Sequence, residues 1–298
     1  MTRASARGVG GGLEVISPGP LTTIQDLGRP GWAHLGISRS GAADRASLRL
    51  ANRLAGNPQD AAALETTLQG PRLRAVDDVL AVLAGAPCSA QVDGRDVAMH
   101  TPIVIGAGQE LNVGRARRGV RTYVAFAGGL GVAAVLGSRS TDTLGGLGPA
   151  PLAAGDRLTV LNPIGELPAV DVVPVAEPEA EIEVALLLGP REDWFAPELV
   201  ARLHDRPYTV GAASNRVGLR LEGEPCQWAR TGELRSEGIL PGAVQVPPSG
   251  QPIVLMADHP TTGGYPVLGV VTESDLDRVA QLRPGGRLRF RPLPVTLA

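Results

Sequence analysis

The sequence predicts a mainly β protein of two lobes with a few short helices. Glycine (39) and proline (26) make up more than a fifth of the 298 residues, while the apolar content of 43% is ordinary for a globular protein. Turn formers at this density, between short apolar or alternating runs, favour short strands joined by many turns. The length allows two domains. Residues 162–182, rich in proline and acidic residues without a hydrophobic period, predict a linker between them.

The remaining three parts follow from this division. Residues 1–12 are polar and glycine-rich and predict a disordered leader, 13–161 an N-terminal β lobe with one helix, and 183–292 a C-terminal β lobe. The segments Leu152–Val160 and Leu282–Phe290 share the form Leu-x-x-Gly-x-Arg-Leu-x-apolar, and each ends its lobe. The pattern fits two related lobes, or a glycine turn that leads into an alternating strand by chance.

One helix interrupts the strands of the N-terminal lobe. It is predicted over Ala42–Ala55, because Leu48, Ala51 and Leu54 share one face and Gly56-Asn57-Pro58 ends it. The stretch 21–35 is predicted as a loop. Strands are predicted at Leu13–Ile16, Leu64–Leu68, Val79–Ala84, Ala90–Val92, Ile103–Ile105, Glu110–Val113, Arg121–Ala127 and Leu158–Leu161.

The C-terminal lobe is predicted to contain six strands and two helical turns. The helical turns are Pro197–Leu203 and Leu276–Gln281. The strands are Glu183–Leu188, Gly218–Glu222, Ala243–Val246, Ile253–Ala257, Val267–Val271 and Arg287–Arg291.

The basic residues restrict the chemistry. All 28 are arginine, and the chain has no lysine. This excludes a Walker-type phosphate loop, a Schiff-base lysine and a covalent lysine carrier such as biotinyl-lysine. Any anion must be held by arginine, histidine or backbone N–H groups. The net charge of −2 gives no argument for a nucleic acid or membrane partner, and no apolar run approaches the ~20 residues that span a bilayer.

The cysteines and the N-terminus indicate the compartment. Cys88 and Cys226 form neither a disulfide framework nor a metal-ligand spacing, so no metal site is expected. We expect two small buried side chains in a reducing environment. Residues 1–12 lack the apolar core of a signal peptide. The expected location is the cytoplasm.

The first candidate site is the polar crossing between the apolar runs 253–257 and 267–271. Asp258 and His259 would point to opposite faces of a continuing strand, so they can share a site only if the strand ends before them. Pro260 favours such an end. His259 would then be a proton shuttle or hydrogen-bond donor and Asp258 a second polar contact. Alternatively, Asp258 caps the turn and His259 is a solvated loop residue.

The next five residues of the crossing are suited to ligand contact. Two glycines let backbone N–H groups approach a ligand closely, and the hydroxyls add neutral donors. A tight hairpin between two buried strands explains the same residues equally well. These residues are Thr261, Thr262, Gly263, Gly264 and Tyr265.

Two further groups could bind an anion. Ser40 and Asp44, with His34 and Arg39 nearby, lie at the start of the predicted helix, where free N–H groups suit an anion or a polarised carbonyl. Ordinary capping by Ser40 and Asp44 also accounts for them. Arg216 could hold a carboxylate or phosphate through its planar fork, or pair with a surface acid.

Several long strings resemble the allophanate hydrolase subunit 2 family, also described as KipA-like, as the C subunit of 5-oxoprolinase and as biotin-dependent carboxyltransferase-like. In the N-terminal half they are GPLTTIQDLGRPG, GISRSGAADRASLRLANRLAGN and AALETTLQGP. In the C-terminal half they are SNRVGLRLEG, SEGILPGAVQVPPSGQPIVLMADHPTTGGYPVLGVV and DLDRVAQLRPGGRLRF. The resemblance covers residues 13–290.

The resemblance implies a fold of two cyclophilin-like β-barrel lobes. It implies the C subunit of an ATP-dependent 5-oxoprolinase, which opens 5-oxoproline to glutamate. Its partners would be a KipI-like B subunit and a LamB/YcsF-like A subunit, and ATP would be shared with these partner subunits. One alternative is the carboxyltransferase half of a biotin-dependent urea or amide carboxylase, with biotin on another protein. Another is a non-catalytic regulatory partner of a KipI-like kinase inhibitor.

The resemblance also ranks the candidate residues. The crossing agrees closely with the family, which makes His259 and Asp258 the expected catalytic residues and 261–265 expected substrate contacts. Arg29 and Arg216, with the Gly263-Gly264 backbone, would hold anionic groups. At the helix start Ser40, Gly41 and Asp44 are kept, but Ala-Ala follows where the family more often has Pro-Met. The resemblance therefore supports substrate contacts at the helix start less strongly than substrate contacts at the crossing.

Overall fold

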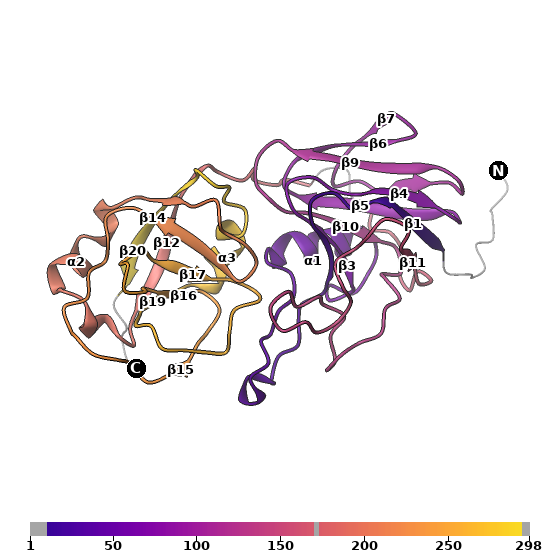
Figure 1. The fold of residues 1–298 in the computed structure, drawn as a ribbon. Coiled ribbons are helices and arrows are strands. Elements are labelled where there is room, and N and C mark those ends of the chain that lie inside the picture. The colour runs from indigo at the N-terminus through magenta and orange to yellow at the C-terminus, as the bar shows by residue number, and fades with distance from the viewer. Residues whose placement is uncertain (1–10, 170–172, 294–298) are drawn as a thin grey trace.

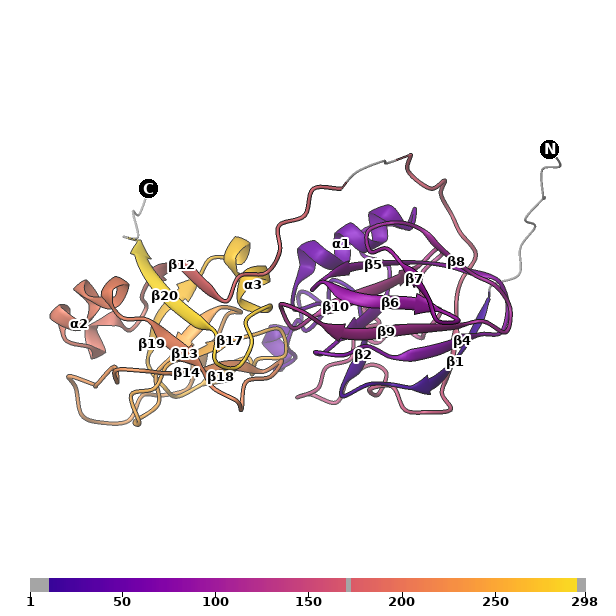
Figure 2. The same cartoon turned by 90° about the horizontal axis from the view of Figure 1, so that it is seen from above.

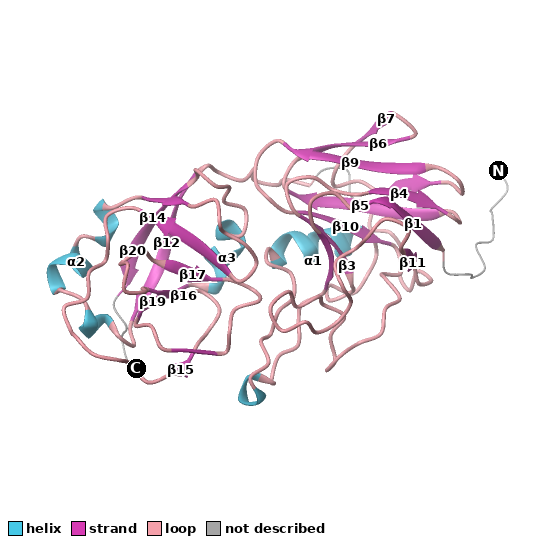
Figure 3. Cartoon of the chain, in the orientation of Figure 1, coloured by secondary structure: helices cyan, strands magenta, loops and turns pink. Residues whose placement is uncertain are grey.

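The structure is a computed structural model that describes residues 11–169 and 173–293. Two lobes lie side by side, with helices α1 (Arg45–Leu54) and α3 (Glu273–Val279) facing each other across the junction (Figure 1). Viewed from above, α1 runs along one edge of the N-terminal lobe and the barrel strands lie beyond α3 (Figure 2). Strand and loop dominate both lobes (Figure 3). The mainly β prediction is therefore confirmed.

The N-terminal lobe is built from two antiparallel sheets. The six-stranded sheet has the order β11-β1-β4-β9-β6-β7, and the five-stranded sheet has the order β2-β3-β10-β5-β8. Apolar side chains from both sheets form one shared core. The strands are β1 (Gly12–Ser17), β2 (Thr22–Gln25), β3 (Ala63–Thr66), β4 (Arg72–Ala75), β5 (Val79–Gly85), β6 (Cys88–Val92), β7 (Arg95–Val97), β8 (Ile103–Ile105), β9 (Glu110–Ala116), β10 (Thr122–Phe126) and β11 (Arg157–Thr159).

Helix α1 covers the outer face of the five-stranded sheet. Its apolar face, with Leu48, Ala51 and Leu54, packs against Val82 of β5 and Tyr123 of β10. This second cluster explains why β10 is buried on both faces. A short 3-10 helix, η1 (Ala33–Leu35), lies on the loop that precedes α1.

The C-terminal lobe is a closed barrel with strand order β12-β19-β16-β17-β14-β13-β20. Its first strand, β12, pairs in parallel with its last, β20. The strands are β12 (Glu181–Leu188), β13 (Tyr208–Val210), β14 (Gly218–Glu222), β16 (Ala243–Gln245), β17 (Ile253–Leu255), β19 (Val267–Val271) and β20 (Arg287–Leu293); β15 (Glu237–Gly238) and β18 (Thr262–Gly263) form a separate ribbon. Short helices α2 (Pro197–Ala201), η2 (Glu192–Trp194) and η3 (Leu203–Asp205) follow β12.

Several predicted elements differ from those observed. The predicted loop 21–35 contains strand β2, whose four residues are all buried although three are polar. Strands β4, β7 and β13 and the two ribbon strands β15 and β18 were not predicted. Helix α1 begins at Arg45 rather than Ala42. Most of the predicted leader lies outside the described residues. The described part of the predicted linker contains no helix or strand before Glu181.

Two further sequence expectations concern the cysteines and the membrane. Cys88 and Cys226 are both buried and free, in different lobes. Within residues 11–169 and 173–293 no helix has the length and apolarity needed to cross a bilayer.

Candidate functional site: a cleft between the lobes

The polar crossing does not form a tight hairpin. Strands β17 and β19, which precede and follow it, are not neighbours, because β16 lies between them in the barrel. The crossing instead runs along the end of the barrel that faces the N-terminal lobe. Within it, Thr262 and Gly263 pair with Gly238 and Glu237. The hairpin alternative is therefore wrong.

Asp258 points into the lobe junction and is fully buried. Its carboxylate accepts hydrogen bonds from the Ser40 hydroxyl at 2.7 Å and from the Thr143 hydroxyl and backbone N–H at 2.7 and 3.0 Å. Burial raises the pKa of this carboxyl, but the charge and hydrogen bonds of Arg216 outweigh burial and hold the pKa below its usual value. Asp258 is thus an ionised, fully bonded side chain, and it does not line the cleft described below.

Arg216 is the main ionic link between the lobes. Its Nε and Nη2 donate to the two oxygens of Asp258, each at 2.9 Å, in the bidentate geometry that suits arginine. Its Nη1 donates to Glu65 of β3, and its Nη2 also donates to the Gly41 carbonyl at 2.7 Å. Burial disfavours its charge, but the two carboxylates more than compensate and raise its pKa. The predicted anion ligand of Arg216 is therefore supplied by the protein itself.

Glu65 connects this link to strand β10. Its Oε1 accepts from Arg121 at 2.8 Å, and its Oε2 accepts from the Tyr123 hydroxyl at 2.7 Å and from the Ala43 N–H at 2.9 Å. Burial would raise the pKa of Glu65, but Arg216 and Arg121 together lower it. Burial and the neighbouring carboxylates raise the pKa of Tyr123 well above its usual value, so its hydroxyl stays a donor.

Ser40 is held in a conformation that serine rarely adopts. Its φ is +52°, in the left-handed region, and its hydroxyl bonds to Asp258 across the junction. The backbone at Arg39 and Ser40 packs so closely on Gly28 that a Cβ there would lie 2.4 Å from the Arg39 carbonyl oxygen. The backbone of Arg39 and Ser40 thus packs tightly on the N-terminal lobe, while the Ser40 side chain contacts the barrel.

His259 lies next to Asp258 in sequence but faces a different space. It lines a cleft of about 350 Å³ between the lobes, and its own exposed fraction is 3%. The cleft is formed by two loops of the N-terminal lobe and by the crossing. The lining residues are Gly36, Ile37, Ser38, Asp142, Leu144, Gly145, Leu147, His259, Pro260, Thr261 and Thr262.

The hydrogen bonds of His259 define its tautomer. Its Nδ1 lies 2.8 Å from the Pro260 carbonyl oxygen, which can only accept, so Nδ1 carries the proton. Among the described residues none bonds to Nε2. Burial lowers the pKa of His259 despite the opposing effects of Asp258 and Asp142. The neutral ring therefore retains a lone pair on Nε2 that can accept a proton.

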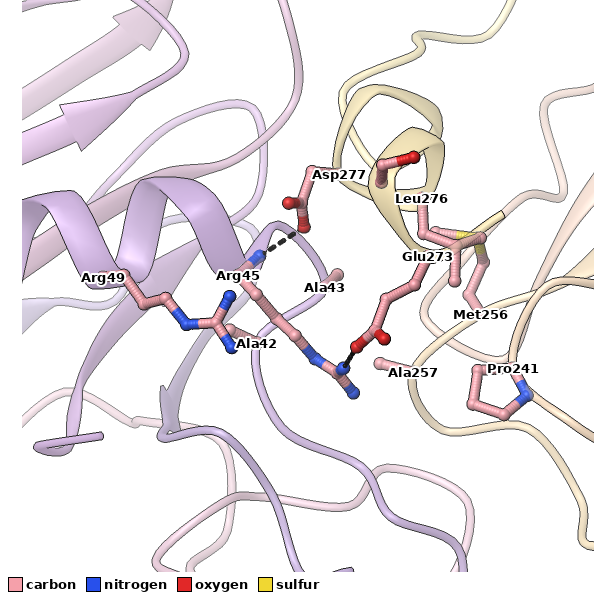
Figure 4. Close-up of a pocket in the computed structure, with 11 residues that line it drawn as sticks. Ala42, Ala43, Arg45, Arg49, Pro241, Met256, Ala257, Glu273, Leu276 and Asp277 are labelled. Carbon is pink, nitrogen blue, oxygen red and sulfur yellow. Dashed lines mark hydrogen bonds and ion pairs between the residues drawn. The ribbon is translucent and has the colours of Figure 1, made fainter. Parts of the chain in front are cut away.

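The start of helix α1 is occupied by a carboxylate of the other lobe. Asp277 of α3 accepts from the Arg45 N–H at 2.7 Å and the Ala46 N–H at 3.3 Å, while Glu273 pairs with the Arg45 guanidinium (Figure 4). Asp44 caps the helix by accepting from the Ser47 N–H at 2.9 Å. The free N–H groups expected to bind an anion are therefore already bonded.

Asp44 itself is buried in a structural role. It also accepts from Gln281 of the C-terminal lobe at 2.7 Å. Burial, with the nearby charge of Asp277, raises its pKa to about 6. The capping interpretation of Asp44 thus agrees with the structure, and the proposed substrate contact has no geometric support.

Arg29 lies behind the cleft rather than on its surface. It is 1% exposed, and its Nη2 donates to the Ser140 carbonyl at 2.5 Å. Its Nη1 lies 4.0 Å from the Asp142 carboxylate, which lines the cleft. Arg29 is placed to support Asp142, not to contact a ligand directly.

The crossing residues divide into two groups. Thr261 and Thr262 line the cleft, whereas Gly263, Gly264 and Tyr265 do not. A Cβ on Gly263 would lie 2.6 Å from the Ile239 Cδ1 atom, so a larger residue there would have to displace the end of that side chain. Of the predicted site residues, the structure brings together His259, Thr261 and Thr262 in the cleft.

Two cleft residues escaped the sequence analysis. Ser38 donates to Asp142 at 2.9 Å, and Asp142 also accepts the N–H groups of Leu144 and Gly145. The sequence feature that could have indicated Asp142 is an acid shortly before Gly145-Gly146, a pattern typical of a tight loop. In the network behind the cleft, Glu65 was also missed, although an acid inside the run LETTL was a visible anomaly for a buried strand. Within the described residues no group of three His, Cys, Asp or Glu side chains is arranged to hold a metal ion.

This fold, with its interlobe cleft, defines a class of protein. The family model "Carboxyltransferase domain, subdomain A and B" matches residues 35–292, and the chain belongs to this family. Among its relatives is the C subunit of the 5-oxoprolinase of Escherichia coli (strain K12), which is 39% identical over 283 residues that cover 93% of this chain and 90% of that protein.

Larger proteins contain the same unit. The urea amidolyase of Lachancea kluyveri is 32% identical over 96% of this chain, which spans 17% of that protein. The crystal structure of the K. lactis urea amidolyase superposes with a TM-score of 0.87 at 31% identity and covers 97% of this chain, which spans 19% of that structure. The fold is thus that of the carboxyltransferase region of those enzymes.

Proposed function

We propose that the chain is the C subunit of an ATP-dependent 5-oxoprolinase, which opens 5-oxoproline to glutamate. Its partners in this proposal are a KipI-like B subunit together with a LamB/YcsF-like A subunit. The observation that carries the proposal is the match to the C subunit of a known 5-oxoprolinase, which extends over 93% of this chain and 90% of that protein.

The cleft suits one part of this chemistry. Hydrolysis of a lactam adds water across the C–N bond, so a proton must leave the water and reach the nitrogen. The neutral His259, with its free Nε2, can relay that proton. Thr261 and Thr262 offer hydroxyls for the amide and carboxylate of a small ligand, and Ser38, whose proton goes to Asp142, can accept from an amide N–H. A volume of about 350 Å³ is at the small end of ligand sites.

The cleft does not suit the nucleotide. None of its lining residues is an arginine, and the chain has no lysine, so no cationic side chain faces a triphosphate there. In the proposed enzyme, ATP is therefore held mainly by a partner protein. This chain contributes the part of the site that binds 5-oxoproline. Coupling to ATP is chemically reasonable because unactivated amides open slowly.

The test combines the three purified subunits with 5-oxoproline and ATP and follows glutamate release. The expected result is activity only when all three are present. If omitting this chain leaves the rate unchanged, the proposal is wrong. Adding His259→Gln protein instead of the wild type separates a catalytic from a scaffolding contribution.

The second candidate is half of a biotin-dependent carboxyltransferase. The matches to urea amidolyase favour it, since they extend over 96% of this chain. Without lysine, the biotin must be carried by another polypeptide. The discriminating experiment supplies a separately biotinylated carrier, biotin carboxylase and urea. Labelled bicarbonate that enters urea only when this chain is present would favour this candidate over the first.

A further inference from the structure

A second cavity lies between the lobes, away from the His259 cleft. Its volume is about 250 Å³, and it shares no lining residue with the cleft. Most of its lining is apolar and comes from both lobes. The lining residues are Leu21, Thr67, Leu68, Val120, Arg121, Ala212, Ser214, Asn215, Arg216, Leu219, Met256, Val279, Ala280, Leu282 and Pro284.

The cavity contains a buried arginine with unused donors. Arg121 is 5% exposed, and among the described residues its side chain makes one hydrogen bond, from Nη1 to Glu65. Its Nε is buried without a partner. Arg216, on the same Glu65, by contrast donates from all three of its nitrogens. A guanidinium has five N–H donors, and leaving them unbonded away from water is costly.

The buried ion pairs around Arg121 contain as many guanidiniums as carboxylates, so they carry no net negative charge. Arg216 and Arg121 are balanced by Glu65 and Asp258. Beyond them, Arg283 donates to the carbonyls of Gly119 and Ala116, close to the Arg121 backbone. Burial, with a smaller effect of the nearby Arg115, lowers the pKa of Arg283.

The backbone at the cavity is also unusual. Leu68 has a φ of +64°, which is uncommon for a bulky residue. Its N–H donates to Val120 and its carbonyl accepts from Ala116, so the conformation is fixed by both neighbours. Left-handed non-glycine residues concentrate at ligand sites, where the surrounding structure holds them in place.

We propose that this cavity binds a small monocarboxylate with a compact apolar body. The carboxylate accepts from Arg121, whose planar fork matches two oxygens, and the apolar part packs against Leu219, Met256 and Val279. The size of the cavity excludes nucleotides and other large ligands. The site is independent of the proposed lactam-opening activity, because binding is a property of this chain alone.

The test uses isothermal titration calorimetry on the full chain with cyclopentanecarboxylate as the probe and cyclopentanecarboxamide as its uncharged counterpart. The carboxylate should bind saturably, and the amide should bind at least about tenfold more weakly because it lacks the negative charge that pairs with the guanidinium. The matched pair of variants is Ala212→Trp and Ala213→Trp. Both alanines are exposed neighbours, but only Ala212 lines the cavity.

The variants give separable outcomes. Ala212→Trp should abolish binding by filling the mouth, while Ala213→Trp should bind as the wild type does. Arg121→Gln should weaken binding at least about tenfold, with thermal unfolding used to verify that the variant is folded. The proposal is overturned if the wild type shows no saturable binding. It is equally overturned if Ala212→Trp binds normally, or if folded Arg121→Gln binds as tightly as the wild type.

Discussion

Two consecutive residues of the crossing, Asp258 and His259, show how differently one loop can use its side chains. Asp258 is ionised, and both its oxygens are bonded to Arg216, Ser40 and Thr143. His259 is neutral, with one nitrogen bonded to its neighbour's carbonyl and the other without a partner among the described residues. One side chain joins the lobes, and the other faces a cleft.

The difference teaches that burial and charge alone do not identify a site. The network of Arg216, Asp258 and Glu65 is more deeply buried than the cleft, contains more ion pairs and has more strongly shifted pKa values. Arg216, Asp258 and Glu65 satisfy one another, however, and among these groups only the neighbouring Arg121 keeps a buried nitrogen without a partner among the described residues. The cleft has fewer charges but retains free acceptors and hydroxyls, which is what binding and proton transfer require.

The largest effect is expected from Arg216→Met. It leaves Glu65 and Asp258 buried without their shared cation, so stability should fall by about 3–5 kcal/mol. Urea denaturation measures this loss. Arg220→Met, an exposed neighbour on β14, should change stability by less than about 0.5 kcal/mol. Equal effects of the two substitutions would show that the network is not a structural link.

A pH effect should follow from Asp44. Its pKa is raised from 3.8 to about 6, so the folded state binds its proton more tightly than the unfolded state. The stability from this group is present below pH 3.8 and is lost as the pH rises through about 6. About two pKa units correspond to at most about 3 kcal/mol. Between pH 4 and 7, Asp44→Asn should gain this amount relative to the wild type in denaturation curves. Parallel pH curves would contradict the assignment.

The third prediction concerns His259→Gln in the reconstituted enzyme. Loss of a general acid–base group should reduce glutamate release by at least about 100-fold, or about 2.7 kcal/mol in the barrier, with a much smaller stability change than Arg216→Met. The wild-type rate should stay level down to pH 6.5 and fall only below it, because burial lowers the pKa of His259. His204→Gln, an exposed control, should leave the rate unchanged. Full activity in His259→Gln would remove His259 from the mechanism.

The smallest effect is expected from Thr143→Val. It deletes the hydroxyl bond to Asp258 but keeps the backbone bond, so stability should fall by about 1.5 kcal/mol. Thr101→Val, which removes an exposed hydroxyl bond to a carbonyl, should have less effect in the same thermal unfolding assay. If Thr101→Val is the more destabilising of the two, Asp258 does not depend on its neutral donors.

The sequence predicted the strands best where apolar residues were continuous. Gly218–Glu222 and Val267–Val271 were predicted with the observed bounds, because each run is ended by turn residues. Strand β2 was missed because Thr22, Thr23 and Gln25 are polar. They are buried because their side chains bond within the lobe, as Gln25 does to the Thr141 carbonyl. Such bonding is not visible in a hydrophobic pattern.

The sequence predicted a site at the crossing, and the structure places only some of the predicted residues in the cleft. His259, Thr261 and Thr262 come from one stretch and were recognised together. Asp142 and Ser38 belong to loops that are distant from it in sequence and meet it only across the lobe junction. Arg216 was predicted as a substrate contact and Asp258 as a catalytic residue, because the sequence does not show that each is the other's partner. That assignment depends on a pairing across the barrel end, 42 residues apart.

The side chain of Gln281 has a consequence for how the chain folds during synthesis. Its amide accepts from the N–H groups of Val120 and Arg121 and donates to Asp44 and the Arg121 carbonyl, so the N-terminal lobe depends on it for four hydrogen bonds. Strand β20, which closes the barrel onto β12, follows only a few residues later. A nascent chain that ends before Arg287 lacks β20, so its barrel has an open edge, and its Gln281 is not yet free to bond the N-terminal lobe. A ribosome-stalled chain of that length should therefore be more sensitive to protease in both lobes than the released protein.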